Sequence, residues 1–568
     1  MKMPKLPRLV CFAFLLSSSI PPGFAQDAPR NLVKNVGAVG RHLDGKTAMR
    51  AVAFMQNYWR HAGNQDFNLC MDYFATALRA GGFAAADSFF RLSVRDTLLP
   101  QARAWQPFDA ELRLVAPIDS LLHSLAQAKM SLCVNSHATP LPGASMELVF
   151  IDSIEIAPQS LRGKAAYTHQ PPASVFERAV KLGEAAGIVS SYLPDYNQPA
   201  EHPSSISMSS IPYIDSPSVF AFKISYGSQV LLDSLMRQGK VEVHASVLAQ
   251  FTPKIVREVS VEIVGQQKPE EIIVLIAHVD EPGANDNASG CGALLEMALT
   301  LRRLIASGEL PRPARTLNFM WVEEIATVRR WQKSTPRVFD KIKAALVLDM
   351  VGEDVVKTGG SFLIEKTPDP SAIWTRPPDE HTEWGQGDVA EADLRGSFLN
   401  DLFYAACEAR ARQMQLPWLI KTNPFEGGSD HVPFVHNGIP AILAWHFTDV
   451  YYHTSNDDID KVSASEMANV AVSVAATALF LANCSETDAV ETVRLLSKRA
   501  AWRIANETQN NLRSNDSSEN RRILQAWLKW YEEAFDSVAS LNLGAGGKAL
   551  AAEIRRAQEG LNRLAKER

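Results

Sequence analysis

The sequence lacks a long basic tract and has no excess of positive charge. Its formal net charge is -6 at pH 7, and its isoelectric point is about 6.1. A nucleic-acid surface needs clustered lysine and arginine, so no nucleic-acid partner is expected, and a peptide or small molecule fits better. The 568 residues are 46% apolar and 21% charged, which suits a folded protein of two or three domains.

Cysteine is scarce as well. The chain has six cysteines and no CxxC motif, and five remain without the N-terminal segment that holds Cys11. This odd and sparse set excludes a disulfide scaffold, although an oxidising compartment would permit a disulfide. At least one thiol is expected to stay free, and burial is the default for such a residue.

Long apolar runs are missing beyond the N-terminus, so the mature chain is expected to be soluble and to have no membrane span. At the N-terminus, three basic residues precede an apolar stretch over 9–20, and the small-residue site Gly23-Phe24-Ala25 follows. This order predicts a signal peptide over 1–25 and hence a secreted or periplasmic protein. A membrane anchor is the alternative, but the run is shorter than the ~20 residues that a span needs.

The composition changes along the chain and divides the rest of it into four parts. Apolar residues at helical spacing predict two helices over 47–82, within an N-terminal part of the main domain over 26–105. Short β-rich runs between Pro- and Ser-rich loops predict a mainly β inserted domain over 106–254. Strands alternate with helices over 255–484, and polar periodic helices predict a C-terminal helical extension over 485–568.

The alternation over 255–484 predicts the fold class, which is α/β with a mixed, largely parallel central sheet flanked by helices. In such sheets ligands bind beyond the carboxyl ends of the strands. Functional side chains are therefore expected at this edge.

Acidic and imidazole side chains follow the apolar strands and recur in the later loops of this part: His278, Asp280, Asp286, Glu323, Glu324, Asp349, Asp430, His431 and His453. Histidines with carboxylates form the nitrogen and oxygen set that suits zinc and similar divalent ions. Taken alone, an Asp in a turn more often bonds the nearby backbone or caps a helix than binds a metal, and a pair of Glu residues at a strand end is usually solvated. Their convergence on one edge favours a metal site.

The ordered motifs AHVD…GANDNASG, WVEE, LDMVGED, SDHVPF and YYHTSNDDIDKV resemble those of the di-zinc aminopeptidases of metallopeptidase family twenty-eight, in the zinc exopeptidase clan. The resemblance covers 256–465. It implies a secreted metallo-aminopeptidase that binds two zinc ions per chain and removes N-terminal residues from peptides. Residues 110–250 are similar to the protease-associated domain inserted in many secreted members.

The resemblance also implies which residues bind the metals. His278 and Asp349 would hold one zinc, Glu324 and His453 would hold the other, and Asp286 would bridge the two. The ions would share a hydroxide that attacks the scissile carbonyl.

Further roles follow from the same resemblance. Glu323 would be the general acid/base, and Asp280 would orient His278 by accepting the N–H of the ring nitrogen that does not bind the metal. Tyr452 would help to hold the oxyanion, or it would simply pack at a strand end. Glu281 has no role in this scheme.

The sequence departs from the family pattern at two places beside the site. Only seven residues separate His278 from Asp286, so the loop between them must turn tightly, and IATVRRW replaces a glycine-containing sequence after the Glu pair. Three alternatives stay open: a carboxypeptidase of the same clan, a single-zinc glutaminyl cyclase, and a non-catalytic binding ectodomain.

Overall fold

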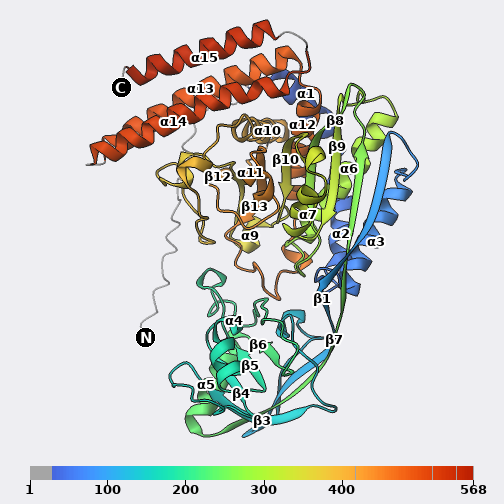
Figure 1. The fold of residues 1–568 in the computed structure, drawn as a ribbon, viewed down its shortest axis with the longest axis vertical. Helices are drawn as coiled ribbons and strands as arrows, with labels where there is room; N and C mark the ends of the chain where they lie inside the picture. The colour runs from blue at the N-terminus through green and yellow to red at the C-terminus, as the bar shows by residue number, and fades with distance from the viewer. Residues whose placement is uncertain (1–27, 416, 514–515, 545–546, 567–568) are drawn as a thin grey trace, which may run out of the picture.

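A computed structural model of the protein describes residues 28–415, 417–513, 516–544 and 547–566. The predicted signal peptide over 1–25 lies outside the described residues. Two modules follow one another along the long axis of the molecule. Two long strands, β1 (Phe90–Ala116) and β7 (Val241–Ile263), run from one to the other (Figure 1). We call the two modules the α/β module and the inserted module.

The α/β module is built on a sheet whose strands lie in the order β12-β11-β13-β10-β8-β9-β7. Its strands are β7 (Val241–Ile263), β8 (Lys268–His278), β9 (Arg315–Val322), β10 (Ile342–Leu348), β11 (Ser361–Glu365), β12 (Ile420–Asn423) and β13 (Ala441–Phe447). Strands β13, β10, β8 and β9 are parallel neighbours, whereas β7 and β11 pair antiparallel with β9 and β13. The predicted mixed, largely parallel sheet is therefore confirmed for this module.

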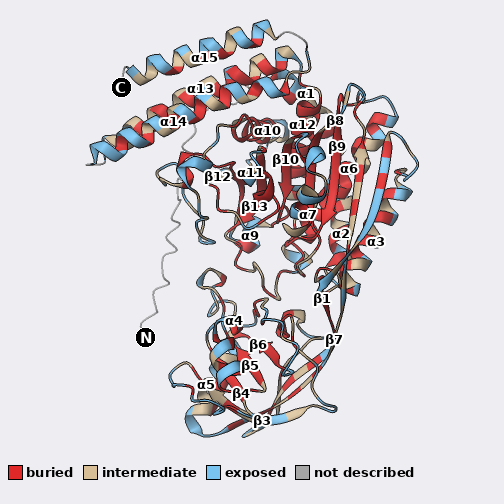
Figure 2. Cartoon of the chain, viewed as in Figure 1, coloured by how far each residue is buried: buried red, intermediate tan, exposed pale blue. Residues whose placement is uncertain are grey.

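Helices cover both faces of this sheet. They are α6 (Ala288–Ala306), α7 (Ala326–Ser334), α8 (Pro336–Phe339), α9 (Val355–Thr358), α10 (Leu399–Met414), α11 (Val432–His436) and α12 (Ala464–Ala482). Successive side chains of β8 point to opposite faces: Ile273 and Leu275 pack in the cluster with α6 and α12, Val274 and Ile276 in the cluster with α7 and α11. A strand that is buried on both sides has a continuous apolar sequence, as β8 has from Ile272 to Ala277 (Figure 2).

Three N-terminal helices pack on the same module: α1 (Arg30–Val39), α2 (Lys46–Met55) and α3 (Gln65–Ala80). The last two are the helices predicted over 47–82. Three more form the C-terminal layer at the top of Figure 1, α13 (Glu486–Asn511), α14 (Ser517–Ser537) and α15 (Lys548–Lys566), as expected for a helical extension.

The inserted module holds β2 (Ser120–Ser124), β3 (Ala144–Phe150), β4 (Ala165–Thr168), β5 (Gly187–Ser190) and β6 (Phe220–Lys223), with α4 (Pro172–Phe176) and α5 (Tyr226–Gln238). Strands β3 to β6 pair parallel, and β3 joins β7, which itself pairs with β1 (Phe90–Ala116) over most of its length. Its core is formed by these short strands together with parts of β1 and β7, so the β character expected for 106–254 is present beside two helices.

Two expectations about apolar residues can be checked in the described part of the chain. Helix α12 is long and apolar enough to cross a membrane, contrary to the expectation that no run beyond the N-terminus would be, but 83% of its apolar window is buried in the protein. It is apolar because it packs between α1, α10 and α6. The five described cysteines are free and buried, as expected.

Candidate metal centre

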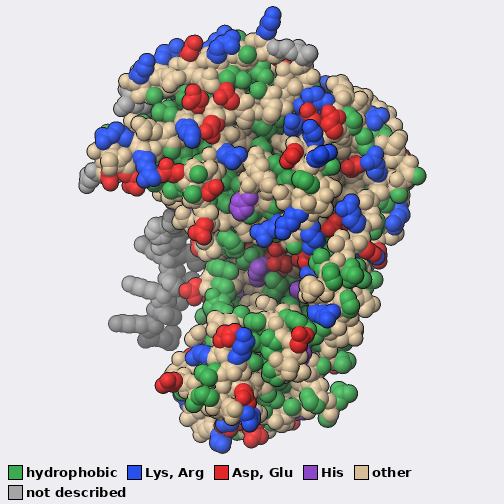
Figure 3. All heavy atoms as spheres, in the orientation of Figure 1, with side chains coloured by type: hydrophobic (Ala, Val, Ile, Leu, Met, Phe, Trp, Pro, Cys, Tyr) green, Lys and Arg blue, Asp and Glu red, His purple; other side chains and the backbone are tan. Residues whose placement is uncertain are grey.

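The carboxyl ends of four parallel strands bring the predicted residues together. His278 is the last residue of β8, Glu323 and Glu324 follow β9, and Asp349 follows β10. The loop after β13 carries His453. Figure 3 shows acidic and histidine side chains gathered at the waist between the two modules.

His278 lies at the centre of one group of ligand atoms. Its Nε2 is 3.7 Å from Oδ1 of Asp286 and 3.9 Å from Oδ1 of Asp349, while its Nδ1 is 3.9 Å from Oε1 of Glu324. One ligand atom each from His278, Glu324 and Asp349 lies within 4.8 Å of the others. The structure thus brings together the residues predicted for the first zinc and the bridge, with Glu324 beside them.

His453 lies at the centre of a second group. Its Nε2 is 3.0 Å from Oδ2 of Asp286 and 3.1 Å from Oε2 of Glu281, a residue without a predicted role. The His453 side chain is 31% exposed whereas that of His278 is 1% exposed, so the second position faces the solvent. Asp286 approaches His278 with one carboxylate oxygen and His453 with the other, an arrangement that suits a bridging ligand.

The residues present fit divalent metal ions. Within the described residues, Nε2 of His278, Oδ2 of Asp286 and Oδ1 of Asp349 are buried and make no hydrogen bond. Buried polar atoms are normally satisfied, because leaving one unpaired costs about 1–3 kcal/mol. Buried histidine nitrogens and carboxylate oxygens that converge without hydrogen-bond partners form the kind of donor set that binds zinc.

The electrostatics of the site reflect this crowding. Burial, then the negative charge of Asp286, raises the pKa of Glu281 to about 7, and burial raises that of Asp349 to about 6. Burial alone would lower the pKa of His278, but the charges of Asp349 and Glu324 outweigh it and hold that pKa well above its usual value. Without cations the cluster therefore retains protons near neutral pH.

Glu323 lies apart from both groups in an ion-pair network. Its Oε1 is 2.5 Å from Nζ of Lys254 on β7, and its Oε2 is 2.5 Å from Nη1 of Arg330 on α7. Burial would raise the pKa of Glu323, but the two cations outweigh burial and hold it below its usual value. The role of Glu323 as a general base stays a prediction, and its carboxylate is occupied on both sides.

The turn after the Glu pair has an unusual backbone. Ile325 adopts φ 55°, a left-handed value that is strained for a β-branched residue, and the amide of Ala326 donates to the carbonyl of Glu324. The amide of Ile325 donates to Oδ1 of Asp430. The carboxylate of Asp430, 105 residues further along the chain, thus holds this turn.

The two remaining predicted residues, Asp280 and Tyr452, also lie at the site. Asp280 accepts a hydrogen bond from the amide of Glu324, while the carboxylate within 3.6 Å of Nδ1 of His278 belongs to Asp430. The ring of Tyr452 stacks on that of His453 at 3.8 Å between centroids. Burial, then the charge of Asp286, raises the pKa of Tyr452 well above its usual value, so its phenol stays protonated.

The short loop from His278 to Asp286 is held by two distant residues. The buried guanidinium of Arg60 donates to the carbonyls of Val279 and Gly283, at 2.9 and 2.8 Å. The carboxylate of Asp457 accepts hydrogen bonds from the backbone amides of Asp286, at 2.9 Å, and Asn285. Arg60 is fully buried and comes from the N-terminal part, so no local pattern linked it to the loop.

The inserted module contacts the loop that carries His453. Nδ2 of the buried Asn197 donates to the carbonyls of Val450 and Tyr452, at 3.0 and 3.1 Å, and the amide of Met208 donates to the carbonyl of His453 at 2.7 Å. The second group is therefore positioned from both modules.

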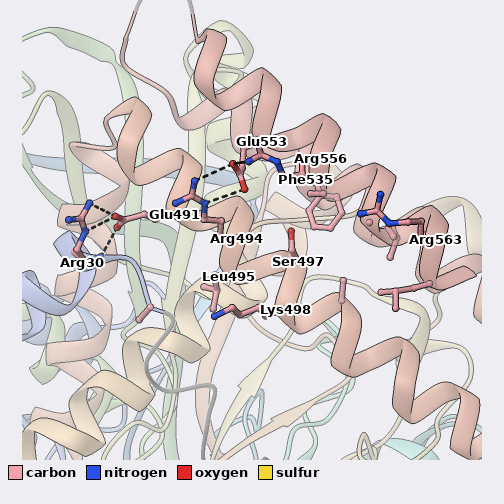
Figure 4. A pocket seen from close by; sticks show the side chains of 16 residues that line it. Arg30, Glu491, Arg494, Leu495, Ser497, Lys498, Phe535, Glu553, Arg556 and Arg563 are labelled. Atoms are coloured by element: carbon pink, nitrogen blue, oxygen red, sulfur yellow. Dashed lines mark hydrogen bonds and ion pairs between the residues drawn. The ribbon is translucent and has the colours of Figure 1, made fainter.

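A cavity of about 810 Å³ lies elsewhere, between the C-terminal helices (Figure 4). Its polar rim consists largely of paired charges, such as Arg30 with Glu491 and Arg494 with Glu553. Its lining holds no histidine, so the metal centre at the waist is the candidate functional site.

Comparison with a family model identifies the segment that carries this site. Residues 258–478 match the model of Peptidase family M28. The resemblance inferred over 256–465 is thereby confirmed for this domain. The chain is also 34% identical over 93 residues to an aminopeptidase of Pseudomonas aeruginosa, a match that spans 15% of this chain and 16% of that relative.

Solved structures resemble the fold over a larger share of the chain. A peptidase M28 precursor from Shewanella amazonensis SB2B superposes with a TM-score of 0.56 at 17% identity, over 80% of this chain and 97% of the other. A zinc aminopeptidase from Bacillus subtilis superposes with a TM-score of 0.52 at 16% identity, over 78% and 96%. At these identities the likeness concerns the fold.

Proposed function

We propose that this chain, whose residues 258–478 match Peptidase family M28, is a metallo-aminopeptidase that uses two zinc ions to hydrolyse the N-terminal peptide bond of its substrates. The observation that carries the proposal is the convergence of two histidines and several carboxylates on one sheet edge, with three buried ligand atoms that make no hydrogen bond within the described residues.

The charge of the site favours an aminopeptidase over a carboxypeptidase. Six carboxylates surround the two histidines: Asp280, Glu281, Asp286, Glu324, Asp349 and Asp430. Once deprotonated they carry a formal charge of −6, which exceeds the +4 of two zinc ions. The excess attracts the ammonium group of a free N-terminus and repels a free C-terminus.

His278 and Asp349 would hold one ion, His453 would hold the other, and Asp286 would bind both. Ions bound there would polarise the scissile carbonyl and bring the pKa of water towards neutrality. Glu323 takes the proton of the attacking water and passes it to the departing amine, a role that requires its carboxylate to exchange its present ion pairs for substrate and water. The phenol of Tyr452 donates towards the developing oxyanion.

Two substrate sets test the proposal. Amino-acid p-nitroanilides carry a free amine, whereas N-blocked dipeptides carry only a free carboxylate. We expect hydrolysis of the first set alone, its loss with a chelator and its return with zinc. Hydrolysis of the second set alone would support the carboxypeptidase. Cyclisation of an N-terminal glutamine to pyroglutamate on the intact peptide, with loss of ammonia, would support the cyclase.

A metal-binding ectodomain without hydrolytic activity is the second candidate. The observation that favours it is the pair of cations on Glu323, which lowers the basicity of that carboxylate. Zinc binding at two ions per chain without hydrolysis of either substrate set would support this candidate.

We also propose that the chain is exported, on the strength of the pattern over 1–25, and that the inserted module is a protease-associated domain. Mass spectrometry of the mature protein in the periplasm or medium would find an N-terminus after Ala25. An uncleaved chain in the cytoplasm would contradict export.

A further inference from the structure

We propose that Glu281, and not Glu324, supplies the carboxylate that completes the second metal position with His453 and Asp286. This inference rests on the proposed function and changes one residue of the ligand set that the family resemblance implies. Glu324 remains beside His278 and Asp349.

The distances around His453 favour this assignment. Ligand atoms about 2.0–2.2 Å from one tetrahedral zinc ion lie roughly 3.3–3.6 Å from one another. Nε2 of His453 is 3.1 Å from Oε2 of Glu281 and 3.0 Å from Oδ2 of Asp286. Both carboxylates thus place an oxygen at nearly the spacing of a shared ion from His453. Glu281 and Asp286 also each offer a ligand atom within 4.8 Å of the other and of His278. Oε2 of Glu281 lies closer to Nε2 of His453, at 3.1 Å, than to Nε2 of His278, at 3.9 Å.

Glu324 lies on the other side of His278. Its Oε1 is 3.9 Å from Nδ1 of His278, the ring nitrogen that faces Asp430 and not Asp286. Its backbone amide is held by Asp280, and the next amide, that of Ile325, is held by Asp430. These bonds fix the turn that carries Glu324 in this position.

The backbone at Glu281 points its side chain into the site. Glu281 adopts φ 75°, a left-handed conformation that costs a non-glycine residue about 1–2 kcal/mol. Such a conformation persists only where the surroundings fix it, and here the amide of Glu281 donates to the carbonyl of Arg60 at 3.0 Å. The guanidinium of Arg60 binds the carbonyls on either side of this turn.

The length of the loop explains why Glu281 can take this position. Only seven residues separate His278 from Asp286, so the chain must reverse within a few residues of the first ligand. The reversal brings the third residue after His278 back against the bridging carboxylate. Oδ2 of Asp286 is buried and, within the described residues, makes no hydrogen bond, which leaves it available to an ion shared with Glu281.

The test measures zinc binding, independent of activity. Wild-type protein, Glu281→Gln, Glu324→Gln and the matched control Glu270→Gln, an exposed residue of β8, are stripped of metal and titrated with zinc against a chromophoric chelator. We expect two ions per chain for wild type and control. Glu281→Gln should weaken one ion by at least about 10-fold and leave the other at its wild-type affinity.

A second set of variants, made in His453→Ala protein, shows which of the two ions is weakened. In His453→Ala the second position has already lost its histidine, so adding Glu281→Gln should change zinc binding little further, whereas adding Glu324→Gln should weaken the remaining ion. Wild-type affinity for two ions in Glu281→Gln would overturn the inference and leave the proposed function intact. Absence of zinc binding by the wild type would overturn both.

A crystal structure of the zinc-loaded wild-type protein would distinguish Glu281 from Glu324 as the ligand without any variant. The anomalous signal of zinc locates both ions. A carboxylate oxygen of Glu281 at about 2.0–2.2 Å from the ion on His453 supports the assignment. Glu324 in that position overturns it.

Discussion

Nζ of Lys254 lies 2.5 Å from Oε1 of Glu323 and so joins the long strand β7 to the end of β9, beside the metal centre. Strand β7 also runs into the inserted module. The carboxylate proposed as the general base is thus bound by a residue of the strand that connects the two modules. Arg330 binds its other oxygen.

Replacement of Glu323 by glutamine tests whether this carboxylate acts in the reaction. Removal of a general base typically lowers kcat by about 10²–10⁴-fold. We expect that loss in Glu323→Gln with two zinc ions still bound, because Glu323 lies apart from both ligand groups, and we expect no loss in Glu270→Gln. Near-wild-type turnover by zinc-loaded Glu323→Gln would exclude the role.

Replacement of Lys254 by methionine should change the pH profile. The cations hold the pKa of Glu323 low, so removal of one raises it, and the acid limb of kcat/KM should move to higher pH. A purely structural role of Lys254 would lower activity equally at all pH values. Lys240→Met, an exposed lysine just before β7, is the control and should leave the profile unchanged.

Replacement of Asn197 by alanine removes the two hydrogen bonds that its side chain donates to the loop of His453. One buried and one partly buried hydrogen bond are lost, so the free energy of unfolding should fall by about 1–3 kcal/mol. The affinity for one zinc ion should fall about 10-fold, as for other residues that orient ligands. Gln238→Ala on the surface of α5 is the control, and unchanged zinc affinity in Asn197→Ala would show that the contact is structural only.

Zinc affinity should rise with pH between about 5 and 7. Glu281 and Asp349 have folded-state pKa values of about 7 and 6, above their usual values, so in this window the metal-free folded chain holds protons that zinc must displace. The zinc-induced increase in Tm should therefore grow as pH rises, and calorimetry at pH 6 in buffers of different ionisation enthalpy should record proton release. A zinc-induced increase in Tm that does not depend on pH would contradict the raised pKa values of these two carboxylates.

The sequence predicted the part of the site that lies at strand ends. His278, Glu323, Glu324 and Asp349 interrupt or follow continuous apolar runs, and because parallel strands end at one edge, their proximity follows from the topology. The inserted module was harder to predict in detail, because strands of four residues such as β5 leave little periodicity.

The sequence could not predict the contacts made over long separations. Glu281 stands in a turn, where an acidic residue is usually solvated, and its inward orientation depends on Arg60, some 220 residues away. Lys254 and Asn197 were inconspicuous for the same reason, since the fold alone brings them to Glu323 and to the His453 loop. Tertiary contacts decided their roles.

The central claim is that two zinc ions at this edge make the chain an aminopeptidase. The most direct measurement is the rate of hydrolysis of a panel of amino-acid p-nitroanilides by metal-free protein as zinc is added, with bound zinc per chain determined in the same samples. The account predicts no hydrolysis without metal and a rate that reaches its maximum at two zinc ions per chain. Two bound zinc ions without hydrolysis of any anilide, or hydrolysis that a chelator does not abolish, would contradict it.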